Sequence, residues 1–185
     1  DVIGPNGNIW MDRNLGATQV ATSSTDADAY GDLYQWGRDA DGHESRTSGF
    51  TYTSSTTNTP GHADFIRGVT DWRSPQNHDL WQGVYGVNNP CPTGYRIPTF
   101  TEISGLGITT AASALSSTLK LPLGGERDYN DADINYLGTR GTYMTSTLQN
   151  TQMGMWSWIM RITPGYTNTS YAAHATGLSV RCIKN

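Results

Sequence analysis

The chain has 185 residues and a formal net charge of −4, with 12 Lys and Arg residues against 16 Asp and Glu residues. This length suits one domain, and the scattered basic residues form no stripe of the kind that nucleic-acid binding requires. Six Trp, ten Tyr and three Phe supply enough apolar area for a folded core, which excludes intrinsic disorder. No apolar run approaches the roughly 18 residues of a membrane span, so we expect no membrane insertion.

The composition predicts short elements joined by long loops. Asp outnumbers Glu thirteen to three, and the chain holds 21 Gly residues. Asp, Gly, Asn, Ser and Thr favour turns and strand edges, whereas long helices favour Glu, Lys, Ala and Leu. We therefore expect one α+β domain over residues 1–185, with short strands and two short helices. Because the chain starts without an initiator Met or a signal peptide, we expect this domain to be excised from a larger protein.

The first predicted elements are a strand over residues 8–12, bounded by Gly-rich turns, and a helix after it. Tyr30, Leu33 and Tyr34 follow helical spacing, and Gly37 is placed to end a helix of about two turns.

A long polar stretch over residues 39–64 follows the predicted helix. Its first residues, Asp39, Asp41 and Glu44, form either a second possible calcium loop or a plain turn, and both interpretations remain open. A loop of this length inside a compact domain is usually functional or mobile. The next segment, residues 71–90, is again expected to be mostly loop.

The second half of the chain is predicted to contain one short helix and three strands. Thr99 and Glu102 fit a capping box, so the helix is expected to begin near Thr99. Residues 105–125 show little pattern. The strands are expected at residues 143–145, 155–162 and 178–183.

The two cysteines, Cys91 and Cys182, lie far apart in the sequence. Neither has a CxxC spacing or a neighbouring His, so a zinc site is not expected. They form either a disulfide that ties the last strand to the middle of the chain or two buried free thiols. A disulfide would place the domain in an oxidising compartment, in the periplasm or outside the cell.

The densest group of oxygen ligands lies in residues 124–135. Asp131-x-Asp133-x-Asn135 matches the opening of an EF-hand loop, although the Gly and Glu that such a loop needs later are absent. Clustered carboxylates repel one another unless a cation joins them, so we expect a Ca²⁺ ion here. A solvated polar loop is the alternative. The expected ligands are the side chains of Asp128, Asp131 and Asp133 and main-chain carbonyls near Gly124 and Glu126.

Sequence motifs of catalysis are lacking. The four His residues are dispersed in polar contexts, and neither an HExxH motif, a GxSxG elbow nor a phosphate-binding glycine loop is found. We therefore expect no enzymatic activity.

Five stretches, in order along nearly the whole chain, resemble the Fibrobacter-type major paralogous domain. The opening IWMDRNLG resembles that family's W-M-x-x-N-L motif, GDLYQW its G-x-x-Y-x-W motif, and CPTGYRIPT its C-P-x-G-[WY]-x-[IV]-P turn. Near the end, YMTST and GLSVRCIK resemble the closing Y-W-S-S-T and G-x-S-V-R-C-V-K motifs. Met144 stands where the family usually has Trp.

The resemblance implies a C-type-lectin-like fold, a disulfide between Cys91 and Cys182, and a place in secreted or surface bacterial proteins. Similar domains occur near the tips of repeats-in-toxin adhesins, where they grip the C-terminal end of a partner peptide with the help of calcium. Formylglycine-generating enzymes share the fold, but their activity depends on free cysteines.

We therefore expect a monomeric, non-catalytic adhesion module of an extracellular, cell-surface protein. Through Ca²⁺ it would bind the C-terminus of a peptide or protein on a host or neighbouring cell. The ligand-binding residues expected beside the ion are Arg127, Asn130, Arg140 and Trp156. The main alternative is a lectin in which sugar hydroxyls fill the calcium positions, although the Glu-Pro-Asn and Gln-Pro-Asp signatures of sugar-binding C-type lectins are missing. A structural spacer is a third possibility.

Overall fold

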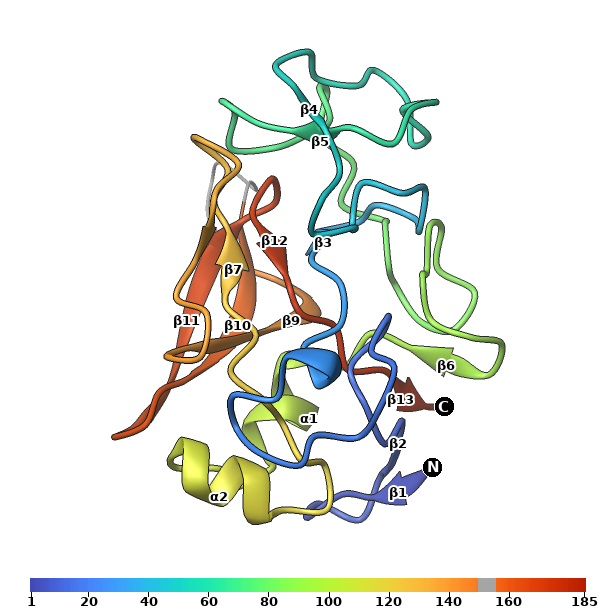
Figure 1. Ribbon diagram of the computed structural model, residues 1–185. Coiled ribbons are helices and arrows are strands. Elements are labelled where there is room, and N and C mark those ends of the chain that lie inside the picture. Colours follow the sequence, from blue (N-terminus) through green and yellow to red (C-terminus); the bar gives the residue numbers. More distant parts are fainter. Residues whose placement is uncertain (150–155) are drawn as a thin grey trace.

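The computed structural model describes residues 1–149 and 156–185. In chain order, the elements in this part of the chain are β1 (Val2–Ile3), β2 (Ile9–Trp10), the 3₁₀ helix η1 (Ala27–Ala29), β3 (Tyr34–Gln35), β4 (Phe50–Thr51), β5 (Phe65–Ile66), β6 (Tyr95–Arg96), α1 (Phe100–Ser104), α2 (Ala111–Ser116), β7 (Glu126–Arg127), β8 (Ile134–Asn135), β9 (Gly141–Leu148), β10 (Trp156–Ile162), β11 (Thr167–Ala173), β12 (Gly177–Leu178) and β13 (Ile183–Lys184). This mixture of strands and two short α-helices is that of an α+β fold, as predicted. The two α-helices lie at one end of the molecule and the β4–β5 pair at the other (Figure 1).

The three longest strands form an antiparallel sheet with β10 in the middle. Along its length β10 pairs with β11, from Trp156 opposite Ala173 to Ile162 opposite Thr167. The aromatic and β-branched residues of β10 favour a strand that packs on both faces. The predicted strands at residues 143–145 and 155–162 lie in β9 and β10, although Met155 lies outside the described residues.

The acidic segment is the turn of a hairpin beside this sheet. Strand β7 pairs with β8, so residues 128–133 form the connection between them. A bridge between Gly125 and Gly141 ties the base of the hairpin to the first residue of β9. On its other side β7 pairs with β12 through Arg127 and Gly177. The hairpin is therefore held from two sides while its turn projects from the sheet.

The two ends of the chain meet in one sheet, where β13 lies between β2 and β6 (Figure 1). Ile183 of β13 is opposite both Trp10 and Arg96. The residue before it, Cys182, forms a disulfide with Cys91, which confirms the pairing that the family resemblance implies.

Two hydrophobic clusters form the core of the described residues. One surrounds the disulfide and the inner face of the central sheet, and the other lies between α1, α2 and the N-terminal strands. The fully buried tryptophans are Trp10, Trp36, Trp72 and Trp81. Trp156 and Trp158 are only partly buried, so the central sheet keeps aromatic area near the surface.

The predicted helix over residues 30–37 is wrong. The 3₁₀ helix η1 ends at Ala29 with Tyr30 as its C-cap, Gly31 then takes a φ of 67°, and the next regular element is strand β3. Leu33 and Tyr34 are both buried because the segment passes through the core with neighbours on every side. The apolar spacing therefore reflects all-round burial and not one face of a helix.

Near the middle of the chain, the helix predicted at Thr99 is confirmed and a second helix was missed. Thr99 and Glu102 form the expected capping box at the start of α1. Helix α2 begins with a similar box. Thr110 is its N-cap, and Ser113, three residues later, takes the position that Glu102 has in α1. Ser at this position is a weaker signal than Glu or Gln.

The strand predicted at residues 178–183 is wrong as one continuous element. Strand β12 ends at Leu178 and β13 begins at Ile183. In between, the carbonyls of Val180 and Cys182 accept hydrogen bonds from the N-terminal loop that follows β2. Ser179 forms an isolated bridge with Tyr143 of β9. The segment therefore changes partners along its length and is not one continuous strand.

Candidate functional site

The acidic turn of the β7–β8 hairpin directs its carboxylates at its own amides. Oδ1 of Asp128 accepts hydrogen bonds from the backbone N–H and the side-chain amide of Asn130, at 2.7 and 2.9 Å. Oδ1 of Asp131 accepts one from the backbone N–H of Asp133 at 2.9 Å. Such bonds are typical of Asx turns. They give two of the three predicted aspartate ligands a structural role inside the turn.

Near Gly124 and Glu126, where main-chain carbonyls were predicted as ligands, the structure describes the side chain of Glu126. One of its carboxylate oxygens accepts a hydrogen bond from Arg140 at 3.2 Å, and the other accepts one from the hydroxyl of Thr142 in β9 at 2.9 Å. Gly124 is buried, and a side chain there would lie 3.1 Å from the Arg46 guanidinium. The Glu126 carboxylate therefore pairs with Arg140 and Thr142.

These positions do not fit a ready-made calcium shell. A calcium ion takes six to eight oxygen ligands, which include carboxylates, carbonyls and waters. Among the described residues, the side chains of the predicted set do not bring three carboxylates within 4.8 Å of one another. Calcium binding at the turn stays a prediction.

A different acidic group does converge. The ligand atoms of Asp41, His43 and Glu44 all lie within 4.8 Å of one another. The third predicted residue of that loop, Asp39, is exposed and accepts a hydrogen bond from the N–H of Ala40. The structure thus gathers two of the three residues predicted for a second calcium loop and adds a histidine.

The hydrogen bonds of this group argue against a metal ion. Nδ1 of His43 lies 2.7 Å from Asp41, and Nε2 accepts the backbone N–H of Gln35. Asp41 also receives Nε of the buried Arg38 at 2.8 Å. A metal on Nδ1 would leave no ring proton to donate to Asp41 while Nε2 stays bonded to Gln35. The group is therefore a closed network that folds the loop after β3.

The four residues predicted to bind ligand lie in different surroundings. Arg127 is buried, and its guanidinium donates to the carbonyls of Ala132 and Ser48. Arg140 donates to Glu126 and lies 3.6 Å from the centre of the Tyr136 ring. Asn130 is exposed at the tip of the turn. Of the four, Trp156 faces a cavity.

That cavity, which we name the hairpin pocket, lies between the acidic hairpin and strands β10 and β11. Its volume is about 150 Å³. It brings together three residues that the sequence predicted separately, namely Glu126, Asp128 and Trp156. The lining residues are Glu126, Asp128, Tyr129, Trp156, Ile159, Arg161, Tyr171, Ala172, Ala173, Thr176 and Leu178.

Arg161 is the lining residue that sequence reasoning missed. It lies in the central strand β10, opposite Thr142 on β9 and Asn168 on β11. Within the described residues its guanidinium makes no hydrogen bond or ion pair, and its Nε is buried. In the sequence, Arg161 stands out only as the one charged residue of β10. That it lines a pocket follows from the position of the sheet beside the acidic hairpin.

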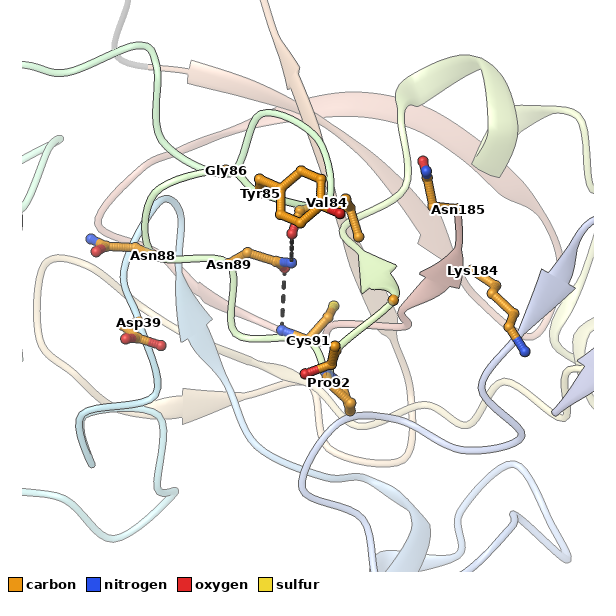
Figure 2. Close-up of a pocket in the computed structure, with 12 residues that line it drawn as sticks. Asp39, Val84, Tyr85, Gly86, Asn88, Asn89, Cys91, Pro92, Lys184 and Asn185 are labelled. Atoms are coloured by element: carbon orange, nitrogen blue, oxygen red, sulfur yellow. Dashed lines mark hydrogen bonds between the residues drawn. The ribbon is translucent and has the colours of Figure 1, made fainter.

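A larger cavity of about 660 Å³ lies beside the disulfide, and Figure 2 shows its lining. Two of its polar side chains, Asn89 and Lys184, already have partners. The side chain of Asn89 donates to the carbonyl of Val84 and accepts from the N–H of Cys91, both at 3.2 Å. Lys184 forms an ion pair with Asp1 at 3.0 Å. A ligand here would have to break these bonds, so volume alone does not make this cavity the better site.

One histidine–aspartate pair, His174 and Asp71, resembles the pairs that act as a general base in enzymes. Nδ1 of the buried His174 lies 2.9 Å from Asp71, and its ring stacks on Trp36 at 4.3 Å. Nε2 is buried and has no hydrogen-bond partner among the described residues. A general base must reach the proton that it removes, and this nitrogen is shielded from solvent.

The chain has no match in comparisons with protein-family models, with curated proteins or with solved structures. The assignment of function therefore rests on this chain's own geometry. Within the described residues, none of the helices has the length and apolarity that crossing a bilayer requires.

Proposed function

We propose that this domain is a non-catalytic adhesion module that binds the C-terminal end of a peptide or protein in the hairpin pocket. The observation that carries the proposal is an arginine without a partner, Arg161, in a pocket walled by aromatic rings. Apolar walls with a few convergent polar groups are the usual composition of a ligand site. Arginine matches a carboxylate through two parallel hydrogen bonds.

The size of the pocket favours an end group over a whole ligand. Sites that enclose small molecules usually measure roughly 300–1,000 Å³. The hairpin pocket has about 150 Å³, which is about half the lower end of that range. This space accepts a terminal residue of a chain whose remainder stays outside.

The wider setting of the proposal comes from the family resemblance. We propose a C-type-lectin-like fold within a larger surface protein, with partners on a host or neighbouring cell. The disulfide between Cys91 and Cys182 supports an extracellular location, because such bonds persist in oxidising compartments. No step of this proposal runs through calcium, since the side-chain carboxylates predicted as its ligands do not converge in the described residues.

The test is a library of short peptides in two forms, with free and with amidated C-termini, measured by fluorescence polarisation. Binding is measured once with calcium and once with a chelator, and thermal stability is followed in parallel. We expect some free-acid peptides to bind and their amides to bind at least about tenfold more weakly. Equal affinity for acids and amides would contradict the proposal. A rise in melting temperature with calcium would show separately that the folded domain binds the ion.

A lectin is the second candidate, and the rings at the pocket mouth favour it. Tyr171 is 48% exposed. Trp156 meets it edge to face, with ring centres 5.6 Å apart. Such rings stack well on sugars as well as on peptide groups. Binding on a glycan array, together with no response to the peptide library, would favour the lectin.

A further inference from the structure

We propose that Arg161 receives the ligand's carboxylate directly, by a two-point ion pair that needs no metal ion. This inference rests on the proposed function and specifies its chemistry. A direct contact would make recognition of the end group insensitive to chelators, unlike the calcium-mediated mode that the family resemblance implies.

The guanidinium of Arg161 is left without a hydrogen-bond partner in the described residues. Arg161 lies in the middle strand of the central sheet, yet within the described residues its side chain has no partner. Nε is buried, whereas the two terminal nitrogens are not among the buried unpaired atoms and make no hydrogen bond in the described residues. A carboxylate in the pocket would pair with both terminal nitrogens, in a forked geometry that suits arginine.

The neighbouring carboxylates do not compete with a ligand for the guanidinium of Arg161. Glu126 is engaged by Arg140 and Thr142. Asp128 turns one oxygen toward Asn130. Neither lies within 4.0 Å of the Arg161 nitrogens, since no such ion pair is present in the described residues.

The charged residues that line the pocket beside Arg161 are Glu126 and Asp128, and the carboxylate of Glu126 is paired with Arg140. Asp128 offers an acceptor for the ligand. The second oxygen of Asp128 has no hydrogen-bond partner among the described residues. It is available to accept the amide N–H of the ligand's last residue.

The lining of the pocket also limits the side chain of the ligand's C-terminal residue. The floor of the pocket is apolar and shallow, with Ile159, Ala172 and Leu178 all buried. Trp156 and Tyr171 form an edge-to-face wall beside it. In about 150 Å³ a carboxylate leaves room only for a small side chain. We infer a preference for Ala, Ser, Thr or Val at the C-terminus over Phe, Trp or Arg.

A small probe of the end group tests the carboxylate contact without knowledge of the natural partner. N-acetylalanine carries the free carboxylate, and N-acetylalaninamide is its uncharged counterpart. Both are titrated in a chelator while the indole N–H signal of Trp156 is followed by NMR, assigned with Trp156→Phe. We expect a saturable shift with the acid and at least about tenfold weaker binding of the amide.

Three variants locate the contact. Arg161→Gln is expected to lower the affinity for the acid at least about tenfold, to the level of the amide. Arg161→Lys keeps the charge but loses the fork, so an intermediate loss is expected. Arg13→Gln makes the same charge change at a partly exposed ion pair with Asp12, away from the pocket, and should bind like the parent.

The outcomes separate this inference from the proposed function. If peptide acids bind but Arg161→Gln binds them equally well, or if a chelator abolishes binding, the inference is overturned and the proposed function stands. If N-acetylalanine binds through Arg161 but no peptide in the library does, the carboxylate site is supported and the proposed function is wrong. Equal shifts with acid and amide overturn the inference. Circular dichroism of each variant shows whether a lost signal reflects unfolding.

Discussion

The backbone N–H of Gln35 donates a hydrogen bond to Nε2 of His43 over 3.0 Å. The other ring nitrogen, Nδ1, lies 2.7 Å from a carboxylate oxygen of Asp41. Because Nε2 is an acceptor, the ring proton lies on Nδ1 and the imidazole is neutral. Burial is the largest cause that lowers the pKa of His43, to about 4. This loop is therefore built around an uncharged histidine.

Stability should fall as the pH falls from about 6.5 to about 4. In this window the unfolded chain protonates His43, whose ordinary pKa is about 6.5, while the folded protein does not. The folded state is therefore penalised progressively on acidification, by a few kcal/mol at most. Urea unfolding across this range measures the slope. An NMR titration that places the His43 midpoint at or above 6.5 would contradict the prediction.

A second, more acidic transition is expected from Glu102. Its carboxylate bonds Arg96 at 2.6 Å and the N–H of the helix cap Thr99 at 2.7 Å. The hydrogen bond from Arg96 is the largest cause that lowers the pKa of Glu102, to about 2. This stabilisation is complete above the ordinary pKa of about 4.5 and is lost as the pH falls toward 2. Glu102→Gln should flatten that part of the stability profile, whereas Asp28→Asn, at an exposed carboxylate, should leave it unchanged.

Arg181 should be among the most costly residues to replace. It is buried and donates to the side chain of Asn14 and to the carbonyl of Leu119. Arg181→Met would leave these acceptors buried without donors, so we expect a loss of roughly 3–5 kcal/mol. Chemical denaturation measures the loss. Arg13→Gln, at a partly exposed ion pair, serves as the comparison and should change stability far less.

Removal of the disulfide should destabilise the fold strongly. Cys91 and Cys182 close a loop of 91 residues, for which the chain-entropy model gives about 4–5 kcal/mol. The double variant Cys91→Ala, Cys182→Ala should therefore unfold at markedly lower temperature than the oxidised parent. Melting temperatures of both proteins, with the reduced parent as a third sample, measure the effect. Equal melting temperatures of variant and oxidised parent would show that the bond contributes little.

Local patterns in the sequence were enough for several features. The capping box of Thr99 and Glu102 depends on residues three apart, so it specifies the start of α1 without any tertiary contact. The acidic segment after β7 also stands out in the sequence, and the calcium ion expected there stays a prediction. The disulfide came from motifs on either side of the two cysteines, which carry the family resemblance.

Other features depend on contacts between residues that are distant in the sequence. Only the tertiary structure decided these features. Tyr30 and Leu33 have helical spacing, but the core surrounds that segment and Gly31 turns it out of the helical region. Glu126 contacts Arg140 and Thr142, which lie 14 and 16 residues further along the chain, because the β7–β8 hairpin folds back toward β9. Arg161 lines the hairpin pocket because the pairing of β10 with β9 brings it beside the β7–β8 hairpin. A sequence pattern records which groups are available, and long-range packing determines which of them are left without a partner.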